Sequence, residues 1–280
     1  MDLSAGFLLI VIGVLAGGYG TIVGAGGGFI FVPALLLIFQ LEPAIAAGTG
    51  LIIVLINSLS GVIGYAKKEK IQYQNGLILG IGALPGSLLG VWLLQHYSSG
   101  YFYVIFATLL VALGTFLFTK NLPEKWRRHV PSEGYEYVAA ASSIGKDGSI
   151  HQSAAVSKID STYKEKWLIP LGFLIGILSS YLGIGGGWLL VPILVYVFKT
   201  PAHYATATSI FSLCLYTSVG VISHIYYGNI DWQTVVYGGL GVIAGSQLGV
   251  LLSQRIPGRV IIQMLSVLLI LIGFRMYFNF

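Results

Sequence analysis

Long apolar stretches separated by short polar turns run along most of this 280-residue chain. Most of these stretches are near the ~20 residues that a helix needs to cross a hydrocarbon core of roughly 30 Å. A membrane barrel would instead show alternating polar and apolar residues in strands of about ten residues. The pattern therefore predicts an all-α polytopic membrane protein. The expected full spans are 45–66, 74–95, 101–119, 203–227, 233–254 and 259–279.

Two further apolar stretches, 3–39 and 167–198, are interrupted in the middle by glycine blocks. These blocks are Gly24-Ala25-Gly26-Gly27-Gly28 and Gly183-Ile184-Gly185-Gly186-Gly187. Because glycine is a poor helix former, we expect the helix to stop at both blocks. The helix that restarts at Gly28 would extend about 18 Å to Phe39, at ~1.5 Å per residue, which is about half of the membrane. The break is therefore expected to lie deep in the membrane.

The chain aligns with itself at an offset of 159 residues. This offset places Gly24 on Gly183 and Thr49 on Thr208, and Val32-Pro33 falls on Val191-Pro192. Each half contains one glycine-broken helical hairpin and three full transmembrane helices, so each half crosses the membrane an odd number of times. An odd number of crossings predicts two inverted-topology repeats. The predicted boundaries are 1–119 for the first repeat, 120–165 for a polar linker and 166–280 for the second repeat.

The composition and the positions of the charges agree with this topology. Only 9% of the residues are charged and 56% are hydrophobic, which excludes an ordinary soluble domain. Of the 15 Lys and Arg residues, all but Arg275 fall on one side of the expected spans. The positive-inside rule then makes the linker 120–165 cytoplasmic and places both termini outside a bacterial or archaeal cytoplasmic membrane. This topology explains the net charge of +5 without a nucleic-acid partner, and the expected partner is the lipid bilayer.

The glycine blocks are the strongest candidates for a binding site. At the start of the helix after each block, free N–H groups and the positive end of the helix dipole favour an anion. Inverted repeats would bring both helix starts towards one centre. Hydroxyl and amide groups on the following spans could complete the site. The candidate substrate-binding residues are Gly24, Gly26, Gly27, Gly28, Thr49, Asn57, Gly183, Gly185, Gly186, Gly187, Thr208 and Ser209.

Several other features have simpler interpretations. Gly82, Gly86 and Gly90 repeat every fourth residue, as do glycines in the second half, and this spacing predicts close helix packing. His224 is a candidate proton relay, with an interfacial histidine as the alternative. An intramembrane serine hydrolase that uses Ser87 or Ser246 lacks a repeated activating group. We therefore expect no enzyme activity, no catalytic residue, no metal and no cofactor.

The combined motifs resemble the sulfite exporter TauE/SafE family over essentially the whole chain. The resemblance lies in the two Gly-x-Gly-Gly-Gly blocks, each followed by Val-Pro, in Ala205 to Ser209 and in Gly228 to Trp232. It implies a secondary transporter that exports sulfite or a small organosulfonate. An anion channel, or a permease for another small anion, is the alternative. The first half departs from the family pattern at Gly50, where a serine is usual. The sequence leaves open whether the protein forms a homodimer.

Overall fold

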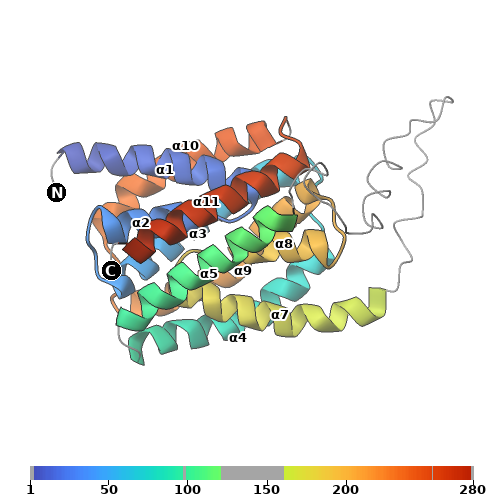
Figure 1. Cartoon of the computed structure of the whole chain (residues 1–280), viewed down its shortest axis with the longest axis horizontal. Helices are drawn as coiled ribbons and strands as arrows, with labels where there is room; N and C mark the ends of the chain where they lie inside the picture. The colour runs from blue at the N-terminus through green and yellow to red at the C-terminus, as the bar shows by residue number, and fades with distance from the viewer. Residues whose placement is uncertain (1–2, 97–98, 121–160, 254, 279–280) are drawn as a thin grey trace.

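A computed structural model describes residues 3–96, 99–120, 161–253 and 255–278 (Figure 1). All regular elements within these ranges are α-helices, which confirms the predicted fold class. The helices are α1 (Leu3–Val23), α2 (Gly28–Leu37), α3 (Pro43–Ala66), α4 (Tyr73–His96), α5 (Ser99–Lys120), α7 (Ser161–Leu182), α8 (Gly187–Tyr196), α9 (Ala202–Tyr226), α10 (Trp232–Ser253) and α11 (Gly258–Phe278).

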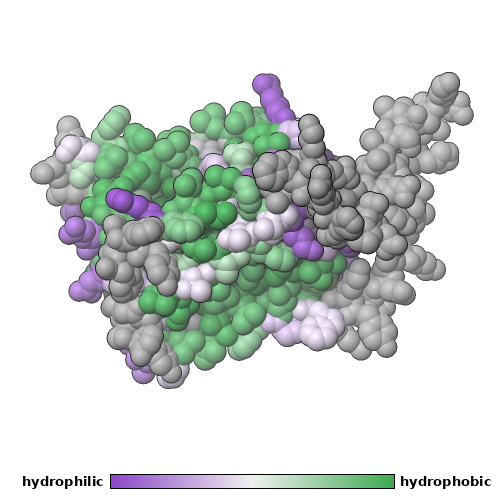
Figure 2. All heavy atoms as spheres, in the orientation of Figure 1, coloured by the Kyte–Doolittle hydropathy of each residue, from purple (hydrophilic) through white to green (hydrophobic). Residues whose placement is uncertain are grey.

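The exterior of the bundle matches a lipid environment. In the described part of the chain, 7 helices are long and apolar enough to cross a membrane, namely α1, α3, α4, α5, α9, α10 and α11. Large apolar side chains such as Trp92, Ile222 and Leu251 are exposed on the outside of these helices. Figure 2 shows a hydrophobic flank, with hydrophilic residues gathered towards the two ends of the bundle. The chain is therefore a multi-pass membrane protein.

The helix stops at both glycine blocks, as the sequence predicts. In the first half α1 ends at Val23 and α2 begins at Gly28, and in the second half α7 ends at Leu182 and α8 begins at Gly187. The two parts of the first hairpin are unequal. The 21 residues of α1 extend about 31 Å, whereas the 10 residues of α2 extend about 15 Å, at ~1.5 Å per residue. Each hairpin therefore combines a long helix with a half-length helix.

Two glycine seams hold the bundle together, and each joins helices from different halves of the chain. A Cβ atom on Gly241, Gly245 or Gly249 of α10 would collide with backbone carbonyl oxygens of α1. A Cβ on Gly86 or Gly90 of α4 would collide in the same way with α7. Such close approach of backbones is the reason for small residues at helix interfaces in membranes. The packing role predicted for these glycines is confirmed.

The two seams are related by the 159-residue offset seen in the sequence. Gly245 lies against the carbonyl of Val14, and at the corresponding positions Gly86 lies against the carbonyl of Phe173. This swapped pairing is what two duplicated halves packed about a two-fold axis would give. The inverted orientation of the halves stays a prediction. Most of the predicted linker 120–165 lies outside the described residues, although α7 already begins at Ser161.

Candidate functional site

The two glycine loops, Gly24–Gly27 and Gly183–Gly186, lie at the middle of the bundle. Gly26 (φ +80°) and Gly185 (φ +75°) both pack against Val54 and Leu213. These two side chains stand near the middle of the 24-residue α3 and the 25-residue α9. The left-handed backbone at the two glycines is strained for any residue with a side chain. Glycine is thus required here by conformation as well as by space.

The two loops also touch each other. A Cβ on Gly28 would lie 2.6 Å from the carbonyl oxygen of Ile184. At the corresponding point of the other half, a Cβ on Gly187 would lie 2.8 Å from Cα of Ala25. The beginnings of α2 and α8 are therefore neighbours, so the positive ends of two helix dipoles meet at one place.

Backbone donors remain available at both helix starts. Neither α2 nor α8 has a side-chain N-cap, and Ile30 and Phe31 donate to the carbonyl of Gly27. Among the described residues, no acceptor is bonded to the N–H groups of Gly28 and Phe29. The same holds for the first two N–H groups of α8, while the N–H of Gly186 donates to the Tyr216 hydroxyl at 2.9 Å. Free N–H groups at a helix start are suited to bind an anion.

The hydroxyl groups of Ser209, Thr49 and Thr208 form hydrogen bonds to the backbone of a glycine loop and of two helix starts. The Ser209 hydroxyl donates to the carbonyl of Gly24 at 2.8 Å, so this serine lies at the glycine loop. Thr49 Oγ1 accepts the N–H of Asp231, and Thr208 Oγ1 accepts the N–H of Gln72, each at 3.0 Å. These two bonds correspond at the 159-residue offset. The structure therefore brings Ser209 to the loops, and it places Thr49 and Thr208 at the starts of α10 and α4.

Asn57 presents a donor inside the bundle. This residue is fully buried, and its Oδ1 accepts from the Thr21 hydroxyl at 3.0 Å. Its Nδ2 atom has no hydrogen-bond partner in the described residues. An unpaired buried donor costs free energy of about 1–3 kcal/mol, so such a group needs an explanation. In the second half Tyr216 occupies the corresponding position and bonds to Gly186.

His224 is buried with partners at both ring nitrogens. Its Nε2 lies 3.2 Å from the carbonyl oxygen of Ser180, and its Nδ1 lies 3.4 Å from Nδ2 of Asn229. Because a carbonyl only accepts, Nε2 carries the proton in this arrangement. The corresponding Tyr65 donates to the carbonyl of Thr21 at 2.8 Å. The structure thus gives His224 a bracing role, and the proton relay stays a prediction.

The serines considered for a hydrolase are engaged elsewhere. Ser87 Oγ lies 2.6 Å from Ser180 Oγ and donates to the carbonyl of Tyr216. Ser246 Oγ lies 3.1 Å from Thr21 Oγ1. In the part of the chain that the structure describes, neither serine is hydrogen bonded to His224. Within the described residues, these two serines therefore form no hydrogen bond to His224 of the kind that joins a nucleophile to its base.

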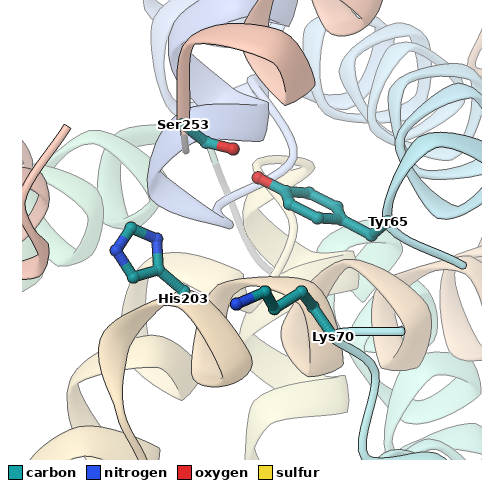
Figure 3. A pocket seen from close by; sticks show the side chains of 4 residues that line it. All are labelled: Tyr65, Lys70, His203 and Ser253. Atoms are coloured by element: carbon teal, nitrogen blue, oxygen red, sulfur yellow. The ribbon is translucent and has the colours of Figure 1, made fainter. Parts of the chain in front are cut away.

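A pocket at one end of the bundle was not predicted from the sequence. It is lined by Tyr65, Lys70, His203 and Ser253 and has a volume of about 190 Å³ (Figure 3). Lys68, two residues before Lys70, donates to the carbonyl of Val250 at 2.8 Å, and partial burial lowers its pKa. The run of lysines could have indicated the pocket, but it is equally explained by membrane topology.

Comparison with known proteins supports the interpretation of the motifs. The family model "Sulfite exporter TauE/SafE" matches residues 9–276. A probable membrane transporter protein of Bacillus subtilis, YunE, is 30% identical over 97% of both chains. A probable membrane transporter protein of Methanocaldococcus jannaschii is 29% identical over 95% of this chain and 93% of its own. No solved structure matches the chain. The chain therefore belongs to the sulfite exporter TauE/SafE family.

Proposed function

We propose that this protein is a secondary transporter that exports a small sulfur-containing anion, sulfite or an organosulfonate, across the cytoplasmic membrane. The observation that carries the proposal is the meeting of two half-helix starts at mid-bundle. Each helix start contributes about half a positive charge, so the pair offers about one. Such a site suits a monoanion or a sulfonate group, whereas a multivalent phosphate normally recruits Arg or Lys.

Two apolar side chains favour a carrier over an open channel. Val54 and Leu213 are fully buried and pack against both glycine loops, so they cover the place where the loops meet. An anion that reaches the loops from one end has to displace these side chains to continue. A movement of α3 and α9 relative to the loops would do this, and such movement is the basis of alternating access.

The arrangement of the chain ends supports the proposed topology. The start of α1 and the end of α11 lie at the same end of the bundle, opposite the end of α5 and the start of α7 (Figure 1). Lys67, Lys68 and Lys70 follow α3 at the end where α5 finishes. We therefore place this end in the cytoplasm, together with the linker 120–165, and both termini outside.

The function is tested by transport with the purified full chain in proteoliposomes. Sulfite, methanesulfonate, sulfate, phosphate and an amine of similar size are offered under an imposed pH or sodium gradient. We expect saturable transport of sulfite or the sulfonate that Gly26→Val abolishes. Preference for the amine would overturn the anion assignment. Flux that does not saturate and does not follow the coupling gradient would establish a channel instead.

A further inference from the structure

The pocket between α3, α9 and α10 is formed by groups that can all donate hydrogen bonds. Tyr65 and Ser253 are almost completely buried and point their hydroxyl groups towards each other. The Lys70 amino group and the His203 ring face each other on the opposite wall (Figure 3). The volume of about 190 Å³ exceeds by roughly tenfold the ~15 Å³ that one water needs. A small oxyanion therefore fits together with some of its water.

The charge of the pocket is positive and is not neutralised by a described residue. Lys70 lies over the ring of Tyr204 at 5.0 Å and, within the described ranges, forms no ion pair with a carboxylate. The ring of His203 faces this amino group in the same pocket (Figure 3). An anion that lies between the two groups would interact with the charge of Lys70 and accept a hydrogen bond from the ring of His203.

The four positions that correspond to the pocket in the other half of the chain carry different residues. At the 159-residue offset, Lys70 corresponds to Asn229, His203 to Ala44, Ser253 to Leu94 and Tyr65 to His224. Asn229 is buried there, and a Cβ on Gly48 would collide with its carbonyl oxygen. All four positions differ between the halves, although the surrounding hydrogen bonds of Thr49 and Thr208 are preserved. The pocket is therefore a property of one end and not a by-product of the duplication.

A hydrogen bond connects the pocket to the glycine loops. The hydroxyl of Tyr65 donates to the carbonyl of Thr21, which lies near the end of α1 and three residues before Gly24. Thr21 in turn bonds to Asn57, which carries the unpaired donor described above. An anion that accepts the Tyr65 proton would compete with the bond to Thr21. Occupation of the pocket is thus coupled to the end of the helix that leads into the loop.

We propose that the pocket lined by Tyr65, Lys70, His203 and Ser253 is a first binding station for the oxyanion head of the substrate on the cytoplasmic side. The identity of the oxyanion, a sulfite or sulfonate group, rests on the proposed function. The location of the site rests on the pocket alone. Lys70 attracts the charge, and the ring of His203 can donate a hydrogen bond. The hydroxyl groups of Tyr65 and Ser253, which donate to the carbonyls of Thr21 and Val250 in this structure, would donate to the anion in place of these carbonyls.

The first experiment measures binding of methanesulfonate and sulfite to the purified full chain in detergent by calorimetry. Replacing Lys70 by Gln, or His203 by Gln, removes a charge-assisted hydrogen bond and should weaken binding by about ten- to a hundredfold. Lys70→Arg keeps the charge and should retain most of the affinity. Lys67→Gln is the matched control, because Lys67 is an exposed lysine of the same turn and lies outside the pocket. Unchanged affinity in both Gln variants would overturn the proposal.

A second readout reports occupancy at the pocket itself. Amine acetylation followed by mass spectrometry should show that methanesulfonate protects Lys70 while Lys67 reacts as before. Equal labelling of Lys70 with and without the anion contradicts the proposal, even if the Gln variants bind weakly. Protection that appears only in nanodiscs with anionic lipid, and is unaffected by methanesulfonate, would assign the pocket to a lipid head group instead.

The two proposals fail in different ways. If wild-type protein transports sulfite normally and the Lys70 and His203 variants do so with unchanged KM, the pocket proposal is wrong and the function stands. If wild-type protein transports neither sulfite nor a sulfonate, but an oxyanion still protects Lys70, the proposed function is wrong and the site stands.

Discussion

Replacing Gly26 by alanine adds one methyl group where the backbone turns between α1 and α2. Gly26 has a φ of +80°, and its Cβ would lie 2.8 Å from Cγ1 of Val54 and 3.2 Å from Cδ1 of Leu213. Both neighbours are fully buried, so they cannot move aside into solvent. The substitution therefore combines a strained backbone with an overpacked core.

The expected cost follows from these two contributions. A left-handed conformation costs about 1–2 kcal/mol for a residue with a side chain, and overpacking typically costs about 1–3 kcal/mol. Gly26→Ala should thus lower the free energy of unfolding by about 2–5 kcal/mol. Val54→Ala removes the methyl group nearest to the clash but leaves φ unchanged. The double variant should therefore recover only the packing part, with a coupling free energy of about 1–3 kcal/mol.

Reversible unfolding in mixed micelles measures these free energies, and uptake into proteoliposomes measures function. Gly239→Ala is the control, because this buried helical glycine would contact only the flexible end of Ile56, at 3.2 Å. We expect the control to change the free energy of unfolding by less than about 1 kcal/mol, because alanine favours a helix over glycine by roughly 0.5–1 kcal/mol and this offsets a small shift of Ile56. The reasoning is refuted if Gly26→Ala is as stable as Gly239→Ala, or if Val54→Ala gives no coupling.

Three further outcomes are expected. Gly90→Val should reduce the yield of folded protein, measured by size-exclusion chromatography, because any side chain there collides with a backbone carbonyl of α7. A normal yield would contradict the close packing of α4 on α7. Thr49→Val and Thr208→Val each remove the acceptor of a backbone N–H and should lower the free energy of unfolding by about 1–3 kcal/mol, whereas Thr→Ser should cost less. Cysteines introduced into 120–165 should react with a membrane-impermeant reagent only after cell lysis, and reaction in intact cells would reverse the topology.

The sequence was sufficient for the features that depend on length and on backbone conformation. The spans follow from the number of consecutive apolar residues, and the breaks follow from three glycines in a row, so α2 and α8 begin where expected. The helix α7 begins at Ser161, before the apolar stretch predicted from 167, because a helix can extend beyond the lipid into polar sequence. Hydropathy alone does not show such an extension.

The features that depend on which side chains meet were not predictable. Val54 and Leu213 look like any other apolar residues of a membrane helix, so the sequence does not indicate that they pack against both glycine loops. Thr49 and Thr208 were singled out because the duplication preserves them, and the structure shows both as acceptors for backbone N–H groups. In the sequence, the positive-inside rule is sufficient to explain Lys70. The pattern of a loop lysine is the same whether its side chain faces into the bundle or into water.

The glycine seam between α1 and α10 has a consequence for biogenesis. The surface that α1 presents to α10 is shaped for a backbone, and lipid tails fill such a groove poorly. Roughly 200 residues separate the two helices, so at ~5–20 residues per second the ribosome needs about 10–40 s to supply the partner. Throughout this time α1 lies in the bilayer or at the insertion machinery, and the side of α1 that will pack against α10 is not yet covered by it. We expect nascent chains truncated before α10 to be the forms that membrane quality-control proteases recognise.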